Sequence, residues 1–181
     1  MTDFLELLAK RQSVRNYNNI PVEAEKLERC LEAARLSPSA CNSQPWTFIV
    51  VDEPELKAKV ARATFSSAVS FNKFAVEAPA FVAVVTEKSS LVPQMGNFLK
   101  NQQYNLIDIG IAIENFVLQA AYEDLGTCIM GWFDEATIKN LLNVPSKKRV
   151  NIVISLGYPS HKTTRKKTRK SLGEIARYNS Y

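Results

Sequence analysis

Histidine is the scarcest reactive side chain in this sequence of 181 residues, which contains only His161. Cysteine is almost as rare, with Cys30, Cys41 and Cys128, an odd number without the spacing of metal ligands. This usage is typical of reduced thiols in a cytoplasmic protein rather than of a disulfide framework or a zinc site. We therefore expect no metal centre and no chemistry based on a histidine base.

Several motifs are missing as well. The six glycines never form GxGxxG or GxxxxGK[ST], so neither of these phosphate-binding loops is encoded. HExxH, CxxC and GxSxG are also missing, and no serine, cysteine or carboxylate stands beside a plausible base, which argues against a hydrolase. The longest apolar region, 106–121, is interrupted by Asp108 and Glu114 and is shorter than the ~20 residues that cross a bilayer.

The amino terminus carries acids where a signal peptide carries bases, as MTDFLELLAKR shows, so we predict a cytoplasmic protein without a membrane partner. With 46% hydrophobic and 23% charged residues, the chain reads as one globular domain over 1–181. Its charge is uneven. Residues 161–181 carry seven Lys and Arg against Glu174, a balance of +6, and the other 160 residues have a balance of −1. A basic tail of this kind binds nucleic acid, acidic lipid or a small phosphate.

Hydrophobic periodicity predicts helices and strands in irregular alternation. The expected helices are a short one around Phe4, Leu5 and Leu8 capped by Thr2, one around 27–34 that stops at Pro38, 53–63, 101–125, and one capped by Asp134 that ends at Leu142. The expected strands are 46–52, 80–86, 127–133 and 150–157. This order favours an α+β or three-layer sandwich around a small sheet.

The predicted helix 101–125 is apolar on nearly every face, with Ile107 and Ile111 on one side and Ile109 and Ile113 on others. Such a helix must be covered all round. In so small a protein we expect a second subunit to supply part of the cover, with Glu114 paired across that interface.

Two polar segments are candidates for binding. In KRQSVRNY, Arg11, Ser13 and Arg15 alternate, so an extended segment directs all three to one side and makes a forked anion site. A solvated basic turn remains the alternative. In SPSACNSQPWTF (37–48), hydroxyls and amides crowd a loop between two core-forming elements, where they either make turns or bind a ligand. Trp46 and Phe48 that follow it are expected in the core.

These two segments, followed by CIMGWFD (128–134) and KTR (167–169), resemble the nitroreductase family of FMN-dependent reductases over almost the whole chain. The resemblance implies a three-layer α-β-α sandwich around a small mixed, mainly antiparallel sheet. It also implies an intertwined homodimer with FMN at the interface, in which a C-terminal extension of about 160–181 packs on the partner subunit.

The resemblance further implies which residues bind FMN. The phosphate and pyrimidine edge would be held by Arg11, Gln12, Ser13 and Arg15, and the C-terminal pair Lys167 and Arg169 would close on the phosphate. The neighbouring subunit would supply Pro38, Ser39, Asn42 and Gln44; Asn72 would contact the ring, and Met130, Gly131 and Trp132 would approach N5. Trp132 stands where many relatives carry a small residue.

The implied activity is transfer of hydride from NADH or NADPH, through flavin N5, to a nitroaromatic, quinone or similar small acceptor by a ping-pong mechanism. No side-chain acid or base is obligatory, which fits the shortage of histidine. A specialised member that fragments flavin or removes halogen is one alternative. A basic-tailed nucleic-acid-binding protein is another, although aromatic residues are not interleaved with the bases as such proteins favour. We therefore expect no nucleic-acid partner.

Overall fold

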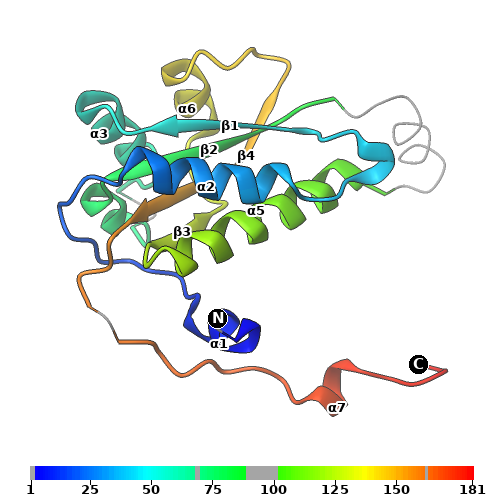
Figure 1. Cartoon of the computed structure of the whole chain (residues 1–181). Helices are drawn as coiled ribbons and strands as arrows, with labels where there is room; N and C mark the ends of the chain where they lie inside the picture. Colours follow the sequence, from blue (N-terminus) through cyan, green and yellow to red (C-terminus); the bar gives the residue numbers. More distant parts are fainter. Residues whose placement is uncertain (1–2, 68–69, 89–101, 162) are drawn as a thin grey trace.

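The computed structural model describes residues 3–67, 70–88, 102–161 and 163–181. Its helices and strands follow one another along the chain as labelled in Figure 1. The helices are α1 (Phe4–Lys10), α2 (Ala24–Arg35), α3 (Pro54–Arg62), α5 (Tyr104–Tyr122), α6 (Glu135–Leu141) and α7 (Leu172–Ile175), with short 3₁₀ helices η1 (Ala40–Asn42) and η2 (Lys73–Glu77). The strands are β1 (Trp46–Val51), β2 (Ala80–Thr86), β3 (Gly126–Met130) and β4 (Arg149–Gly157).

The four strands form one sheet in the order β1-β2-β4-β3, and all three neighbouring pairs are antiparallel. A β-bulge lies in β4, where Val85 pairs with Val150 while Val84 pairs with Ile152. Because side chains alternate between the faces of a strand, this extra residue turns Val150 to the face opposite Ile152. The predicted strand 127–133 is shorter than expected and stops before Gly131.

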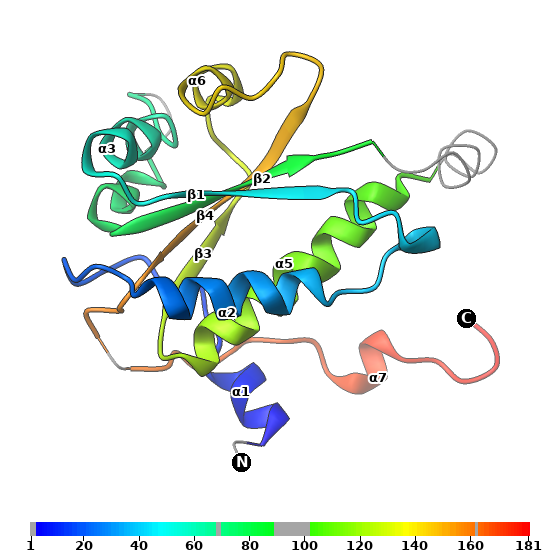
Figure 2. The same cartoon turned by 45° about the horizontal axis from the view of Figure 1, so that its top comes forward.

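Helices cover both faces of the sheet, so the expected three layers are present (Figure 2). On one face, α3, α6 and η2 pack against Phe81, Ala83 and Val153. On the other face, α2 and α5 pack against Val82 and Ile154. β2 lies inside the sheet and contributes to both cores, which explains why its sequence is apolar without interruption.

The predicted core positions at the start of β1 are confirmed. Trp46 and Phe48 are partly buried against the second core, and the Phe48 ring stacks on Phe116 with centroids 6.2 Å apart. The prediction for the first helix cap is wrong, because Asp3 accepts the hydrogen bond from Leu5 N. Thr2 lies outside the described residues, as does Asn101 at the start of the predicted long helix.

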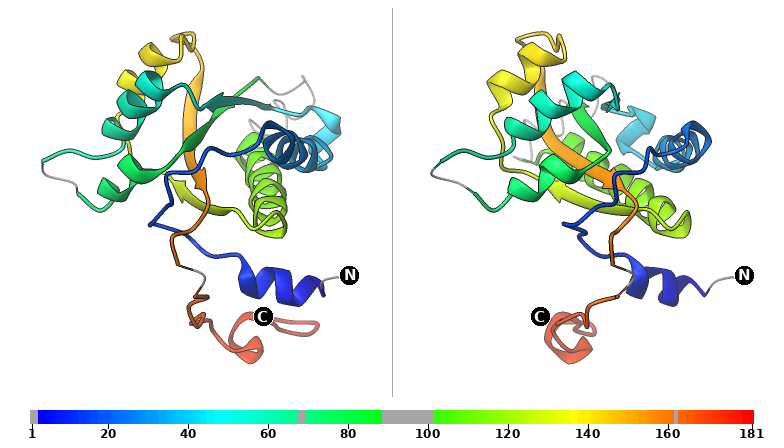
Figure 3. Two further views of the ribbon diagram at one scale, coloured as in Figure 1. Left: turned by 60° about the vertical axis from the view of Figure 1, so that its left-hand side comes forward. Right: turned by 90° about the vertical axis from the view of Figure 1, so that its left-hand side faces the viewer.

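α5 is apolar on nearly every side, but one chain does not cover all of it. Leu106, Ile107 and Ile111 remain 41%, 51% and 39% exposed, whereas Ile109 and Ile113 are buried against the sheet and α2. No helix in the described part of the chain is long and apolar enough to span a membrane. Figure 3 shows that α1 and the C-terminal tail, residues 163–181, leave the layered body on the same side.

Two glycines allow the segment after α1 to approach the sheet. Gly126 of β3 and Gly157 of β4 are cross-strand partners. A Cβ at Gly126 would lie 2.6 Å from Val14 Cγ2, and one at Gly157 would lie 2.4 Å from ring atoms of Pro79 and 3.1 Å from Tyr17. The contacts with Val14 and Pro79 are too close for a Cβ atom, and the one with Tyr17 is tight, so glycine at both positions lets these residues lie against this end of the sheet.

We expect Gly126→Ala to lower the free energy of unfolding by roughly 1–3 kcal/mol, because the methyl group overlaps the β-branched Val14 and must displace it. Urea denaturation measures the change. Gly173→Ala is the matched control, since a Cβ at Gly173 meets open space and should change the stability little. Equal stability of the two variants would contradict the proposed packing.

Candidate functional site

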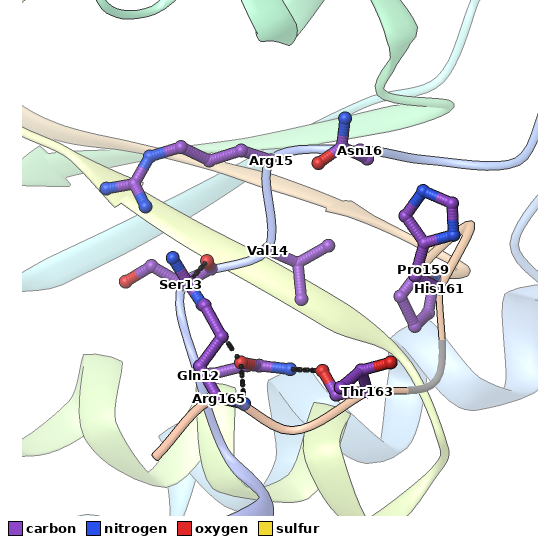
Figure 4. Close-up of a pocket in the computed structure, with 9 residues that line it drawn as sticks. All are labelled: Gln12, Ser13, Val14, Arg15, Asn16, Pro159, His161, Thr163 and Arg165. Carbon is purple, nitrogen blue, oxygen red and sulfur yellow. Dashed lines mark hydrogen bonds between the residues drawn. The ribbon is translucent and has the colours of Figure 1, made fainter. Parts of the chain in front are cut away.

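The segment 11–15 runs along the outer edge of β3. Ser13 forms a parallel bridge with Thr127, and Val14 N donates to Thr127 O at 2.8 Å. Figure 4 shows the result of this extended course: the side chains of Ser13 and Arg15 leave the segment on one side and Val14 on the other. The expected alternation is therefore present for these residues.

Arg11 contains an unsatisfied buried donor. Its Nε is buried and has no hydrogen-bond partner in the part of the chain that the structure describes. The nearest carboxylate oxygen of Glu114 lies 3.8 Å away, which is an ion pair but not a hydrogen bond. The Glu114 side chain is 45% exposed. Glu114 thus faces a cation of its own chain, and its pairing across an interface stays a prediction. A buried guanidinium N–H without an acceptor fits an anionic ligand.

The C-terminal tail is bonded directly to this segment. Gln12 Nε2 donates to Thr163 O at 3.0 Å, and its Oε1 accepts from Arg165 N at 3.1 Å and from Arg165 Nε at 3.2 Å. Arg165 Nη2 also donates to Ser13 O at 2.5 Å. Two segments that are 150 residues apart in sequence therefore lie side by side through side-chain bonds rather than a β-ladder (Figure 4).

Lys167 brings further positive charge to the same place. Its ammonium group donates to Leu8 O at 2.6 Å and also to Arg11 O, so it caps the carboxyl end of α1. Burial lowers the pKa of Lys167, and the nearby charges of Arg11 and Arg169 lower it further. The charges of Arg11 and Arg169, which the resemblance assigned to the phosphate together with Lys167, therefore both act on this ammonium group.

Two cavities border the segment 11–15. The first, of about 290 Å³, lies between residues 12–16 and the start of the tail (Figure 4). The second, of about 490 Å³, is lined by Arg11, Gln12 and the ends of α5 and β3. His161 lines both cavities. Ser13 and Arg15 therefore border the first cavity, Arg11 borders the second, and Gln12 borders both.

Asn72 connects η2 to the turn after β3. It is 5% exposed, and its Nδ2 donates to Thr64 O at 3.2 Å and to Trp132 O at 2.9 Å. The Trp132 side chain is 61% exposed and meets Phe71 edge-on with centroids 6.4 Å apart. The predicted N5 segment 130–132 is thus held through the backbone of Trp132, while the indole remains open to solvent.

Arg15 joins this group to the segment beside β3. Its guanidinium lies over the ring of Phe74, which belongs to η2, at 5.8 Å from the centroid. Segment 11–15, Asn72 and the turn 130–132 therefore lie along the β3 side of the molecule. Within one chain, most of the predicted cofactor positions are brought together here.

The loop 38–44 lies elsewhere. It is found at the amino-terminal end of α5, whereas segment 11–15 runs beneath the other end (Figures 1 and 2). Because α5 has 19 residues, its two ends are roughly 28 Å apart, which gives the scale of the separation between the loop and segment 11–15. Among the described residues, none from 38–44 lines either cavity. The contribution of Pro38, Ser39, Asn42 and Gln44 to the site of a neighbouring subunit remains a prediction.

Sequence reasoning missed Arg165. The resemblance assigned the tail contacts to Lys167 and Arg169, yet Arg165 makes the bonds to Gln12 and Ser13. Seven bases follow His161, and nothing in their spacing separates one from another. The sequence feature that pointed to a contact with the tail was Gln12, because its amide can both donate and accept hydrogen bonds and so can bind an extended backbone.

Comparison with known proteins identifies the family. The family model described as "Nitroreductase family" matches residues 8–158. The chain belongs to the nitroreductase family. The matched range contains the four strands described above and the helices on both faces of the sheet. The resemblance read from the motifs is confirmed.

Three similar proteins from the comparisons have different names. A protein of Archaeoglobus fulgidus named "Putative NADH dehydrogenase/NAD(P)H nitroreductase" is 31% identical, over 88% of this chain and 87% of its own length. An iodotyrosine deiodinase of Thermotoga neapolitana is 26% identical, over 97% of both chains. The structure of an FMN-dependent nitroreductase from Clostridium difficile R20291 has a TM-score of 0.76 at 27% identity and covers 98% of this chain and 100% of that one.

We expect Asn72→Ala to lower the free energy of unfolding by roughly 1–3 kcal/mol, because two carbonyl groups of Thr64 and Trp132 lose their donor. Urea denaturation followed through tryptophan fluorescence measures this change. Asn19→Ala is the control, since Asn19 is exposed. An Asn72 variant as stable as that control would show that Asn72 does not hold the turn.

Proposed function

We propose that this nitroreductase-family protein is an FMN-dependent oxidoreductase that uses NADH or NADPH to reduce a small acceptor such as a nitroaromatic or a quinone. One observation carries the cofactor assignment. Among the described residues the buried Nε of Arg11 has no acceptor, and the charges of Arg11 and Arg169 both act on the Lys167 ammonium group. Three cations, one of which carries the unsatisfied donor, suit a phosphate, because charged donors make the strongest hydrogen bonds to its oxygens.

The phosphate would be held by Arg11, Ser13, Lys167 and Arg169. Two of the three donors of the Lys167 ammonium are used by Leu8 O and Arg11 O, which leaves one for an anion. The side chain of Gln12 is used by the tail, so its role is to fix the position of the tail rather than to bind the ligand directly. The tail and segment 11–13 would therefore act together.

The ring would be held by the groups along β3. Arg15 supplies a cation for the pyrimidine edge, and Asn72 and the turn 130–132 supply polar groups beside the ring. When bound, FMN accepts hydride from a nicotinamide and passes electrons to the acceptor, which is chemistry of the cofactor itself. The protein then contributes binding, orientation and fixed charge.

A second copy of this chain would complete the site. The loop 38–44 lies away from segment 11–15, and Leu106, Ile107 and Ile111 of α5 are uncovered in one chain. The apolar tail residues Leu172 and Ile175 are 78% and 65% exposed as well. A homodimer would bury these side chains and could bring each loop to the site of the other chain.

A dehalogenase is the second candidate function. The similarity to the Thermotoga neapolitana iodotyrosine deiodinase extends over 97% of this chain, so this alternative rests on a relative of the same length. Turnover separates the two candidates. The proposed function predicts oxidation of NADH or NADPH with nitroaromatics or quinones, whereas a dehalogenase would release halide from halotyrosines. The nucleic-acid alternative is disfavoured, because Arg165 and Lys167 already bind segment 8–13.

The absorption spectrum of the purified protein tests the proposal. We expect a yellow protein with the two visible bands of an oxidised flavin, and a released chromophore with the mass of FMN. Colourless protein that does not bind added FMN would refute the proposed function.

We expect Arg11→Ala to weaken FMN binding by roughly 1.5–3 kcal/mol, because a charged hydrogen bond to the phosphate is lost. Isothermal titration measures the affinity. Riboflavin, which lacks the phosphate, is the control ligand and should lose much less affinity. Equal losses for both ligands would show that Arg11 does not bind the phosphate.

We expect Lys167→Ala combined with Arg169→Ala to lower the affinity for FMN and to make it less dependent on salt, since two counter-charges are removed. The matched control is Lys166→Ala with Lys170→Ala, which removes equal charge from exposed neighbours in the same tail. Titrations at several salt concentrations compare the two variants. Identical behaviour would mean that the tail acts only through its total charge.

A further inference from the structure

Two side chains of α5 hold the start of the loop 38–44. Asp108 Oδ1 accepts a hydrogen bond from Ala40 N at 3.1 Å, and Asn115 Nδ2 donates to Ser37 Oγ at 2.7 Å. Seven residues make about two turns, so both groups lie on one side of the helix. α5 therefore holds this loop at two points.

The loop needs such support because its backbone is strained. Cys41, Asn42 and Gln44 have φ angles of 51°, 52° and 45°, a left-handed region that favours glycine. Each such residue costs roughly 1 kcal/mol or more and persists only where neighbouring groups fix it. Inside the loop, Ser39 Oγ accepts from Gln44 N at 2.9 Å, and Gln44 Nε2 donates to Asn42 Oδ1 at 3.1 Å. The hydrogen bond from Ala40 to Asp108 ties this strained turn to α5.

Stability alone does not explain an acid at position 108. Asp108 is 5% exposed, and its Oδ2 is buried without a hydrogen-bond partner among the described residues. Burying a carboxylate with one oxygen unpaired is costly, and an apolar side chain of similar size would avoid that cost. Asp108 does, however, provide a hydrogen-bond acceptor for Ala40 N.

We propose that Asp108 is a positioning residue, which holds the loop 38–44 in its strained conformation so that Ser39, Asn42 and Gln44 are set for cofactor binding. This inference rests on the proposed function, in which these three residues contact FMN. The same helix that holds the loop also carries the exposed side chains of Ile107 and Ile111. A second subunit that packed on α5 would therefore receive the loop in a fixed position.

Two substitutions separate positioning from stability. Asp108→Asn keeps an oxygen acceptor for Ala40 N, whereas Asp108→Leu removes it and keeps a side chain branched at Cγ. Hydrogen exchange of the peptide 37–44, measured in protein without FMN, reports directly on whether the hydrogen bond from Ala40 to Asp108 holds the loop. We expect exchange as slow as in the wild type for Asp108→Asn and exchange at least about tenfold faster for Asp108→Leu, because opening of the loop then costs less.

FMN titration and thermal melting of the cofactor-free variants complete the test. We expect Asp108→Leu to bind FMN ~10–100-fold more weakly, the loss of one hydrogen bond to a charged group, without a lower melting temperature. Asp108→Asn should stay within about threefold of the wild type. Unchanged exchange in Asp108→Leu, or faster exchange with unchanged FMN affinity, would overturn the proposal, as would a lower melting temperature in proportion to the lost affinity. Wild-type protein that binds no FMN would instead refute the proposed function, and the exchange comparison would still decide whether Asp108 holds the loop.

Discussion

The close contact between residues 14–17 and the paired glycines of β3 and β4 is the constraint on which the site depends. Without side chains at Gly126 and Gly157, the segment after α1 lies against the edge of the sheet and is fixed by the bridge from Ser13 to Thr127. That position sets Arg11 near Glu114 and Arg15 over Phe74. The tail then has a defined surface to bind.

Electrostatics explain why the two ends of the chain meet. Arg11, Lys167 and Arg169 repel one another, and the lowered pKa of Lys167 reflects both that repulsion and its burial. Backbone carbonyls at the end of α1 offset part of the cost, because they carry the negative end of the helix dipole. In the proposed function the phosphate of FMN would relieve the remaining imbalance, which would give the basic tail a purpose that needs no nucleic acid.

Strands, helices and the extended course of segment 11–15 could be predicted from the sequence, because hydrophobic periodicity and the alternation of Arg11, Ser13 and Arg15 are local signals. The strand 80–86 has the predicted bounds, and Asp134 caps α6 as expected. The β-bulge in β4 and the bonds from Arg165 to Gln12 and Ser13 could not be predicted, since each depends on partners far away in sequence. The anchor from Asp108 to Ala40 was hidden for the same reason.

The central claim is that each FMN site combines segment 11–15 of one chain with the loop 38–44 of another, and mixed dimers test it most directly. One chain would carry Arg11→Ala and the other Asn42→Ala with Gln44→Ala, each variant binding little FMN alone. In a mixed dimer, one site would carry both defects and the other none. Purified mixed dimers should therefore recover FMN in about half of their sites. Mixed dimers that bind no more FMN than either parent would contradict the shared site.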